Sequence, residues 1–168
     1  KIRFRPKRID RWLSESELSV AMSDKNILAW LLEEGSISKR ISINAAFKLD
    51  IIRDSLDIAD DDEYAALRLK REPIRIREVT LSADTKPIVY ARSVIPERTS
   101  SRGYPRLETI GSRPLGDLLF QNDVFIKTDR FFARFHITQN RVVWGRRTHY
   151  SVREYPLIVL EVFLFLGH

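Results

Sequence analysis

A single carboxylic acid interrupts the most apolar stretch of the chain. Nine of the ten residues at 157–166 are apolar, and the tenth is Glu161. On the two-residue period of a strand, Glu161 shares a face with Val159 and Phe163. A carboxylate among such neighbours loses hydration and needs a hydrogen bond or a cation. Glu161 is therefore a candidate for binding a hydroxyl or moving a proton, and the alternatives are a structural ion pair with an arginine or a solvated face.

Arginines share a face with apolar residues in another predicted strand. Arg75 and Arg77 alternate with isoleucines there, and Val79 continues their face. A guanidinium on a partly dry face needs a carboxylate, and its planar fork suits a bidentate one. That carboxylate belongs either to a ligand or to the protein, with Glu161 as one option. The pattern does not rank Arg75 against Arg77.

The segment 111–120 is a third candidate. Its sequence, Gly111-Ser-Arg-Pro-Leu-Gly-Asp-Leu-Leu-Phe120, joins turn residues to a short helix with proline in its first turn. The first N–H groups of such a helix have no intrahelical partner and can hold an anion. An ordinary junction between a loop and a helix has the same pattern, so this signal alone is weak.

Other catalytic and metal-binding patterns are absent from the sequence. The chain has no cysteine, which excludes disulfides, thiol nucleophiles and Cys-based zinc sites. His136, His149 and His168 are not spaced as metal ligands, and no HExxH, GxSxG, GxGxxG or Walker motif occurs. We therefore expect no metal site.

The positive charge of the chain invites a nucleic-acid interpretation. The formal net charge is +6, and six of the first eleven residues are Lys or Arg. No recognition-helix pattern follows this basic segment, and the acidic run at 57–63 is interpreted as a solvated turn. Strand alternation points Arg146 and Arg147 to opposite faces, so we interpret their segment as a sheet edge or a surface. We expect no nucleic-acid partner, and a basic surplus also suits a dianionic substrate.

The distribution of apolar residues indicates where in the cell the protein is expected. The longest apolar stretch has ten residues, about half of what a bilayer-spanning helix needs. The basic first residues lack the apolar core of a signal peptide. We therefore expect no membrane insertion and a cytoplasmic location, which a chain without cysteine allows.

Changes in hydrophobic period predict the elements that position these residues. Apolar spacing of three and four predicts a helix from Asp24 to Glu34, capped by Ser23 and ended at Gly35. A short helix is predicted at 114–120. A period of two predicts strands from Phe47 and over 73–81, 88–95, 124–137, 142–152 and 157–166, the last following a turn at Tyr155-Pro156.

No linker or repeat divides the chain, so we predict one domain over residues 1–168. Residues 1–20 have no sustained period and are expected to pack as an N-terminal arm through Trp12, Leu13 and Leu18. Strands joined by hairpins predict an antiparallel sheet of about six strands with helices covering one face. The predicted class is α+β, and a closed barrel is the alternative.

Six separated blocks occur in an order and spacing that resemble one enzyme family. The blocks are Trp30-Leu-Leu-Glu-Glu-Gly-Ser-Ile-Ser-Lys-Arg40, Ile76-Arg-Glu-Val79, Ala91-Arg-Ser-Val-Ile-Pro96, Ile110-Gly-Ser-Arg-Pro-Leu-Gly-Asp-Leu-Leu-Phe120, Trp144-Gly-Arg-Arg147 and Leu160-Glu-Val-Phe-Leu164. Each block alone is weak, but their joint order is specific and covers most of the chain. The sequence resembles the chorismate pyruvate-lyase family, which makes 4-hydroxybenzoate for ubiquinone synthesis.

The resemblance implies a monomeric, cofactor-free lyase whose ligand lies inside an antiparallel sheet beneath helical flaps. It implies that Arg77 binds the ring carboxylate together with the backbone at Leu115, and that Glu161 faces the ring hydroxyl. A flap residue that is usually Met falls on Ile37, whose stiffer branched side chain can alter ligand release. Arg92 matches a family arginine near the path to the site.

The implied reaction converts chorismate to 4-hydroxybenzoate and pyruvate by elimination with aromatisation. Positioning and electrostatic stabilisation would then be the main contributions of the protein. Whether Glu161 takes the proton or only binds the hydroxyl stays open. The alternative is a ligand-sensing domain, because effector-binding modules of some transcription regulators share this fold. Those modules normally follow a winged helix-turn-helix, for which residues 1–23 are too short and irregular, and a basic nucleic-acid adaptor is a third reading.

Overall fold

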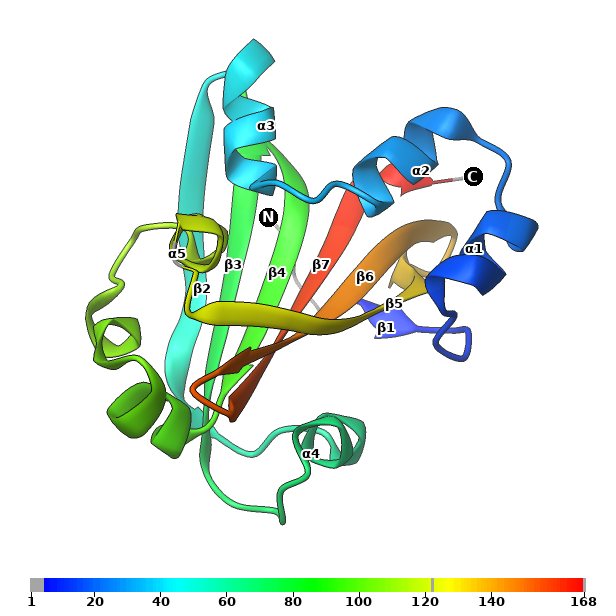
Figure 1. The fold of residues 1–168 in the computed structure, drawn as a ribbon. Helices are drawn as coiled ribbons and strands as arrows, with labels where there is room; N and C mark the ends of the chain where they lie inside the picture. Colours follow the sequence, from blue (N-terminus) through cyan, green and yellow to red (C-terminus); the bar gives the residue numbers. More distant parts are fainter. Residues whose placement is uncertain (1–4, 122, 168) are drawn as a thin grey trace.

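One curled antiparallel sheet forms the centre of the molecule (Figure 1), and the computed structural model describes residues 5–121 and 123–167. The strands are β1 (Lys7–Arg8), β2 (Phe47–Asp57), β3 (Ile74–Ala83), β4 (Lys86–Ile95), β5 (Phe125–Thr138), β6 (Arg141–Val152) and β7 (Tyr155–Gly167). Their order across the sheet is β1-β5-β6-β7-β4-β3-β2. The predicted α+β class is confirmed. The sheet of the described residues has seven strands where about six were predicted, because the N-terminal arm contributes the short strand β1, which pairs with β5.

Two hairpin turns fix the register of the central strands. Asp84 and Thr85 join β3 to β4 with φ of 48° and 71°, and Arg153 and Glu154 join β6 to β7 with φ of 49° and 72°. Two consecutive residues in the left-handed region match the right-handed twist of a hairpin. The turn predicted at Tyr155-Pro156 is therefore two residues too late, because Tyr155 is already the first residue of β7.

The helices are short, and side-chain caps fix where they begin. They are α1 (Glu15–Ala21), α2 (Lys25–Leu31), α3 (Ile37–Asn44), α4 (Asp61–Leu67) and α5 (Leu115–Gln121), with a π-helical turn η1 (Thr99–Gly103) and a 3-10 turn η2 (Pro105–Thr109). Asp24, rather than the predicted Ser23, caps α2 by accepting from the amides of Asn26 and Ile27. In the arm, Ser14 and Glu17 form a capping box that begins α1.

The acidic run at 57–63 begins a helix and is not a solvated turn. The Glu63 carboxylate accepts from the amide of Asp60 at 2.9 Å at the start of α4. Acidic side chains stabilise a helix N-terminus because they face its positive end. Tyr64 and Leu67 of α4 pack on the outer face of the sheet, against Ile74 and Ile76. The other helices contact the inner face, so α4 adds a second covered face (Figure 1).

The inner face of the sheet holds two apolar clusters. One joins Ile37 of α3 to Val79 of β3 and Phe163 of β7. The other joins Leu115 of α5 to Phe125 at the start of β5. Because the sheet curls, β5 crosses over the inner face of the other strands (Figure 1). Members of both clusters line the cavity in which the candidate site lies.

Candidate active site

A cavity of about 370 Å³ lies between the inner face of the sheet and the segments that begin α3 and α5. This volume is in the range of small-molecule sites. Its lining combines apolar side chains with four cationic ones, Arg77, Lys127, Arg130 and Arg146. Of the five residues predicted for the site, Ile37, Leu115, Arg77 and Glu161 line this cavity and Arg92 does not.

Arg77 is buried in the cavity wall that β3 provides. Its Nη1 donates to Oδ2 of Asp54 at 3.2 Å and to the carbonyl of Gly111 at 2.8 Å, while Nη2 donates to the carbonyl of Arg113 at 2.9 Å. Burial lowers the pKa of Arg77, and Asp54 offsets this effect only in part. Among the described residues its Nε has no hydrogen-bond partner. The guanidinium therefore keeps donor capacity for an anion.

Arg75 lies outside the cavity and differs in this from Arg77. Its Nε and Nη2 each donate to the Asp54 carboxylate at 2.8 Å, and its Nη1 donates to the carbonyl of Leu107. Arg75 lies outside the cavity lining. Asp54 is thus the protein carboxylate that the two arginines share. The direct bond between Arg77 and Glu161 that the sequence left open is not formed, because Glu161 has another partner.

The turn before α5 lies directly against Arg77. The guanidinium holds the carbonyls of Gly111 and Arg113, and Gly111 has a φ of 60°, which a glycine adopts without strain. Leu115 follows as the first residue of α5, and its buried side chain packs on Phe125. Leu115 and Arg77 therefore line the same cavity.

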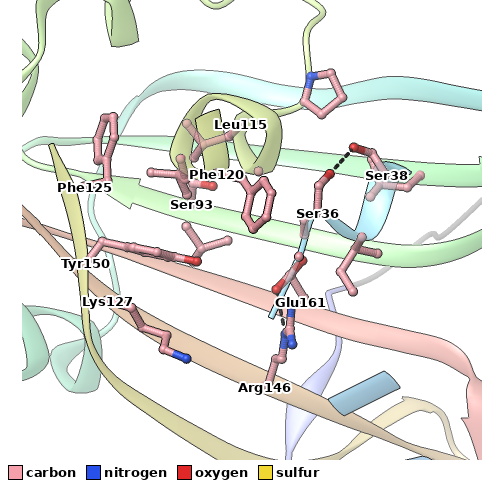
Figure 2. Close-up of a pocket in the computed structure, with 18 of the residues that line it drawn as sticks. Ser36, Ser38, Ser93, Leu115, Phe120, Phe125, Lys127, Arg146, Tyr150 and Glu161 are labelled. Carbon is pink, nitrogen blue, oxygen red and sulfur yellow. Dashed lines mark hydrogen bonds and ion pairs between the residues drawn. The ribbon is translucent and has the colours of Figure 1, made fainter. Parts of the chain in front are cut away.

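Glu161 forms an ion pair with Arg146 inside the cavity (Figure 2). Its Oε1 accepts from Nε of Arg146 at 2.9 Å, and the two residues are direct partners on β7 and β6. Nη1 of Arg146 donates to the carbonyls of Leu31 at 3.0 Å and Glu33 at 2.7 Å. These bonds fix the guanidinium, which in turn fixes the orientation of the Glu161 carboxylate.

Two serines and an aspartate join α3 to α5 beside the cavity. The hydroxyls of Ser36 and Ser38 each donate to Oδ1 of Asp117 at 2.6 Å. The two hydroxyls also lie 2.8 Å apart (Figure 2). Ile37, between the two serines, is buried in the cavity lining. We refer to Ser36, Ser38 and Asp117 as the latch, because these bonds connect the two segments that cover the cavity.

The structure separates Arg92 from the other four predicted site residues. Its side chain points to the outer face, where Nε and Nη2 donate to both oxygens of Glu63 at 2.9 and 2.7 Å. Its Nη1 lies 3.6 Å from Oε1 of Glu78. Arg92 therefore attaches α4 to the sheet from the face opposite the cavity.

The sequence did not single out three cavity residues, Arg130, Arg146 and Tyr150. The interpretation of the Arg146 segment as an edge or surface is wrong, because β6 lies inside the sheet and Arg146 is 2% exposed. The opposite orientation of its neighbour is confirmed, since Arg147 binds Asp62 of α4 on the outer face. If the last hairpin turns at residues 153–154, its strand register pairs Arg146 with Glu161. This register is the sequence signal that could have identified Arg146 as a cavity residue.

Tyr150 contributes a neutral hydroxyl to the cavity. Burial and the nearby Glu161 carboxylate raise the pKa of Tyr150, and the positive charges of Arg130 and Arg146 oppose this rise. Figure 2 shows the Tyr150 and Lys127 side chains extending toward the pair of Arg146 and Glu161. At neutral pH the Tyr150 hydroxyl thus keeps its proton and can donate it to a ligand oxygen.

No group of three or more His, Asp or Glu side chains among the described residues is arranged to hold a metal ion. His168 lies outside these residues. No helix within residues 5–121 or 123–167 is long and apolar enough to cross a membrane.

Relatives of this chain match it over nearly its whole length. The family model of chorismate lyase matches residues 7–167. Probable chorismate pyruvate-lyase 2 of Pseudomonas entomophila strain L48 is 35% identical over 162 residues, which cover 91% of this chain and 87% of that protein. Probable chorismate pyruvate-lyase of Pseudoalteromonas atlantica strain T6c is 28% identical over 169 residues, covering 91% and 85%.

Solved structures share the fold at low identity. The ligand-binding domain of a putative GntR-family transcriptional regulator from Bordetella bronchiseptica has a TM-score of 0.54 and 16% identity, covering 73% of this chain and 87% of that one. The effector domain of PhnF from Mycobacterium smegmatis has a TM-score of 0.51 and 12% identity, covering 78% and 89%. These likenesses concern the fold alone. With a family match that spans residues 7–167, this chain belongs to the chorismate lyase family.

Proposed function

We propose that this protein is a chorismate pyruvate-lyase that converts chorismate to 4-hydroxybenzoate and pyruvate. The observation that carries the proposal is the convergence of Arg77, Leu115, Ile37 and Glu161 on one cavity of about 370 Å³. These residues are far apart in the sequence, and each matches a position to which the family resemblance gives a ligand contact. We further propose that the enzyme works as a cytoplasmic monomer without a cofactor.

The ring of the substrate lies between Arg77 and Glu161. The two residues project from β3 and β7, which β4 separates, so their strands lie about 10 Å apart, and Arg77 is two residues along β3 from the position opposite Glu161. This spacing suits a six-membered ring with a polar group at each end. Arg77 binds the ring carboxylate through charge-assisted hydrogen bonds, with the Leu115 amide as a further donor. Glu161, held by Arg146, accepts a hydrogen bond from the ring hydroxyl.

The elimination breaks the C–O bond between the ring and the enolpyruvyl side chain. The hydroxyl-bearing ring carbon loses its hydrogen as a proton, and the methylene carbon of the side chain gains one to become the methyl group of pyruvate. The electron pair of the broken C–H bond completes the aromatic ring. The protein contributes position and a preorganised charge distribution. Glu161 relays the proton in one route, and the side chain takes it directly in the other.

The product keeps both groups that the protein holds, the carboxylate and the hydroxyl. Product and substrate are therefore bound by many of the same contacts, which predicts slow product release. Release requires the segments that begin α3 and α5 to separate, and the latch opposes this motion.

The direct test incubates the purified protein with chorismate and no added metal. We expect 4-hydroxybenzoate, followed by absorbance, and pyruvate, followed by a coupled assay, to appear in equal amounts. Folded protein that produces neither compound would overturn the proposal.

Replacing Arg77 tests the carboxylate contact. We expect Arg77→Ala to weaken 4-hydroxybenzoate binding by about 2 kcal/mol, because it removes hydrogen bonds from a charged donor. That loss corresponds to roughly 30-fold in Kd, measured by calorimetry. Arg75→Ala is the matched control, since it removes the same charge two residues away but outside the cavity. Equal affinities of the two variants would reject the assignment of Arg77.

A non-catalytic ligand-binding module is the second candidate. The observation in its favour is the fold likeness to the ligand-binding domain and the effector domain of transcription regulators. Such a protein would bind chorismate or 4-hydroxybenzoate in calorimetry and leave chorismate unconverted, so the turnover assay separates the two candidates.

A further inference from the structure

Arg130 is a cavity arginine, 10% exposed, whose carboxylate contacts are long. Its Nε donates to the Thr148 hydroxyl at 2.8 Å, and its Nη1 donates to the carbonyl of Glu33 at 3.1 Å. The carboxylate that comes within 4 Å of it, among the described residues, is that of Glu34 at 3.8 Å. The Glu34 side chain is 70% exposed, against 10% for Arg130, and it forms a closer ion pair with Lys127 at 2.5 Å.

The other cavity arginines are compensated more closely. Arg77 lies 3.2 Å from Asp54, and Arg146 lies 2.9 Å from Glu161. A largely buried guanidinium whose counter-charge is distant or exposed is costly. Burial lowers the pKa of Arg130 and the adjacent positive charge of Arg146 lowers it further, while the carboxylates of Glu161 and Glu34 offset these effects only in part. This corner of the cavity therefore has an excess of positive charge that an anionic ligand can balance.

Arg130 and Arg77 occupy opposite ends of one row of paired residues. The row runs from Arg130 of β5 through Thr148, Val159 and Ser93 to Arg77 of β3. Four strand spacings make this path about 19 Å along the sheet. Because the curl carries β5 over the inner face (Figure 1), both side chains reach the same cavity from different walls.

We infer that Arg130 binds the second carboxylate of the substrate, the one on the enolpyruvyl side chain. This inference rests on the proposed function. Chorismate carries two carboxylates, and its side chain is attached to the ring carbon next to the hydroxyl-bearing carbon. With the hydroxyl at Glu161 and the ring carboxylate at Arg77, the second carboxylate lies on the β5–β6 side of the cavity.

Arg130 suits this role better than its neighbour Arg146. Nε and Nη1 of Arg146 are already occupied by Glu161 and two backbone carbonyls. The side-chain and backbone groups that hold Arg130 are neutral, so its charge is still available. The site distinguishes substrate from product, because 4-hydroxybenzoate has lost the side chain and with it the second carboxylate. Arg130 also lies where negative charge grows on the departing pyruvate as the C–O bond breaks.

The test compares chorismate with 4-hydroxybenzoate on an Arg130→Gln variant. We expect kcat/KM for chorismate to fall by about 10- to 100-fold, the loss of a hydrogen-bonded charge pair. The Kd of 4-hydroxybenzoate should change by less than about 3-fold, because this ligand does not reach Arg130. Arg130→Lys, which keeps the charge, should recover part of kcat/KM. Arg134→Gln is the charge-matched control on the same strand, since Arg134 lies outside the cavity and binds Asp10.

Stability supplies a readout that separates ligand binding from a structural role. Because the Arg130 charge is poorly compensated, Arg130→Gln should leave the Tm equal or higher. Equal losses for chorismate and 4-hydroxybenzoate, or an unchanged kcat/KM for chorismate, would overturn the inference. If wild-type protein makes no 4-hydroxybenzoate, the proposed function fails instead. Calorimetry on wild type and Arg130→Gln then tests the subsite. A loss of affinity in the variant for chorismate but not for 4-hydroxybenzoate would support it, and unchanged chorismate affinity would reject it.

Discussion

The charged groups buried in the sheet differ in what neutralises them. On the outer face, Arg92 binds both oxygens of Glu63, so its charge is balanced within the protein. On the cavity face, Arg77 and Arg130 bond largely to carbonyls and a hydroxyl. A neutral acceptor fixes the position of a guanidinium and leaves most of its charge for a ligand.

Asp54 gives a residue-scale prediction about pH. Hydrogen bonds from Arg75, and then from Arg77, hold the pKa of Asp54 below its ordinary value of 3.8. Its carboxylate therefore stabilises the folded state above that value, and the contribution disappears as the pH falls through the folded-state pKa. We expect Asp54→Asn to lower the free energy of unfolding by about 1–2 kcal/mol at neutral pH. In urea denaturation, the difference from wild type should shrink steadily below about pH 4.

The control for this prediction is Asp50→Asn on the same strand. Asp50 is exposed and 3.4 Å from Lys48, so its replacement should change stability by less than about 0.5 kcal/mol. A wild-type advantage over Asp54→Asn that persists unchanged into strong acid would contradict the assigned ion pairs.

Individual site residues were predictable where they broke a local pattern. Glu161 interrupts an apolar strand, and Arg77 alternates with isoleucine, so both stood out before any fold was known. Arg130 and Tyr150 lie in strands with many polar residues, where a further polar residue is unremarkable. Their burial comes from β5 crossing the inner face, which depends on the curl of the whole sheet.

At the scale of elements, the latch predicts how the cavity opens. Two hydroxyl donors share one carboxylate oxygen of Asp117, which links α3 to α5. Asp117→Asn removes the charge from these bonds, a loss of about 1 kcal/mol or more. We expect 4-hydroxybenzoate to dissociate at least about 5-fold faster in stopped-flow measurements. Amide hydrogen exchange should also rise over residues 36–44 and 115–121.

The hydrogen-exchange measurement needs no ligand, so it tests the latch whether or not the proposed activity is correct. The exposed Asp50→Asn variant carries the same charge change and should match wild type over both segments. Unchanged exchange in Asp117→Asn would mean that apolar packing alone holds the segments together.

The contact between α4 and the sheet gives a second element-scale prediction. Glu63 pairs with buried Arg92, so Glu63→Gln leaves a buried cation without its main partner. We expect a loss of about 3 kcal/mol in the free energy of unfolding. Glu63→Leu combined with Arg92→Met should recover most of that loss, because no buried charge is then left unpaired. Urea denaturation measures both variants.

The same variants test where Arg92 acts. Since Arg92 faces away from the cavity, the double variant should bind 4-hydroxybenzoate within about 3-fold of wild type. A larger loss of affinity in a stably folded double variant would mean that Arg92 affects ligand binding, as the family resemblance suggests.

At the scale of the whole molecule, the strands were predictable and their curvature was not. The hairpins follow from a period of two and polar turns, which are local properties of the sequence. The order in which the hairpins join and the curl of the sheet depend on contacts between distant segments, such as Phe125 with Leu115. The short helices α1 and α4 bury few apolar side chains, Leu18 in α1 and Tyr64 and Leu67 in α4, so their caps are the clearer signal.

The net charge of +6 belongs to the whole molecule, and we expect it to attract anions. A dianionic substrate feels this field over about 30 Å in 10 mM salt and under 10 Å in 300 mM salt. We therefore expect kcat/KM for chorismate to fall several-fold across that range, while the affinity for uncharged 4-hydroxybenzamide stays constant. Viscosity dependence at low salt would show whether encounter limits the rate. If kcat/KM for chorismate does not change with salt, the cavity arginines act only at contact distance. The positive net charge would then need another explanation, and salt-dependent binding of duplex DNA would supply one.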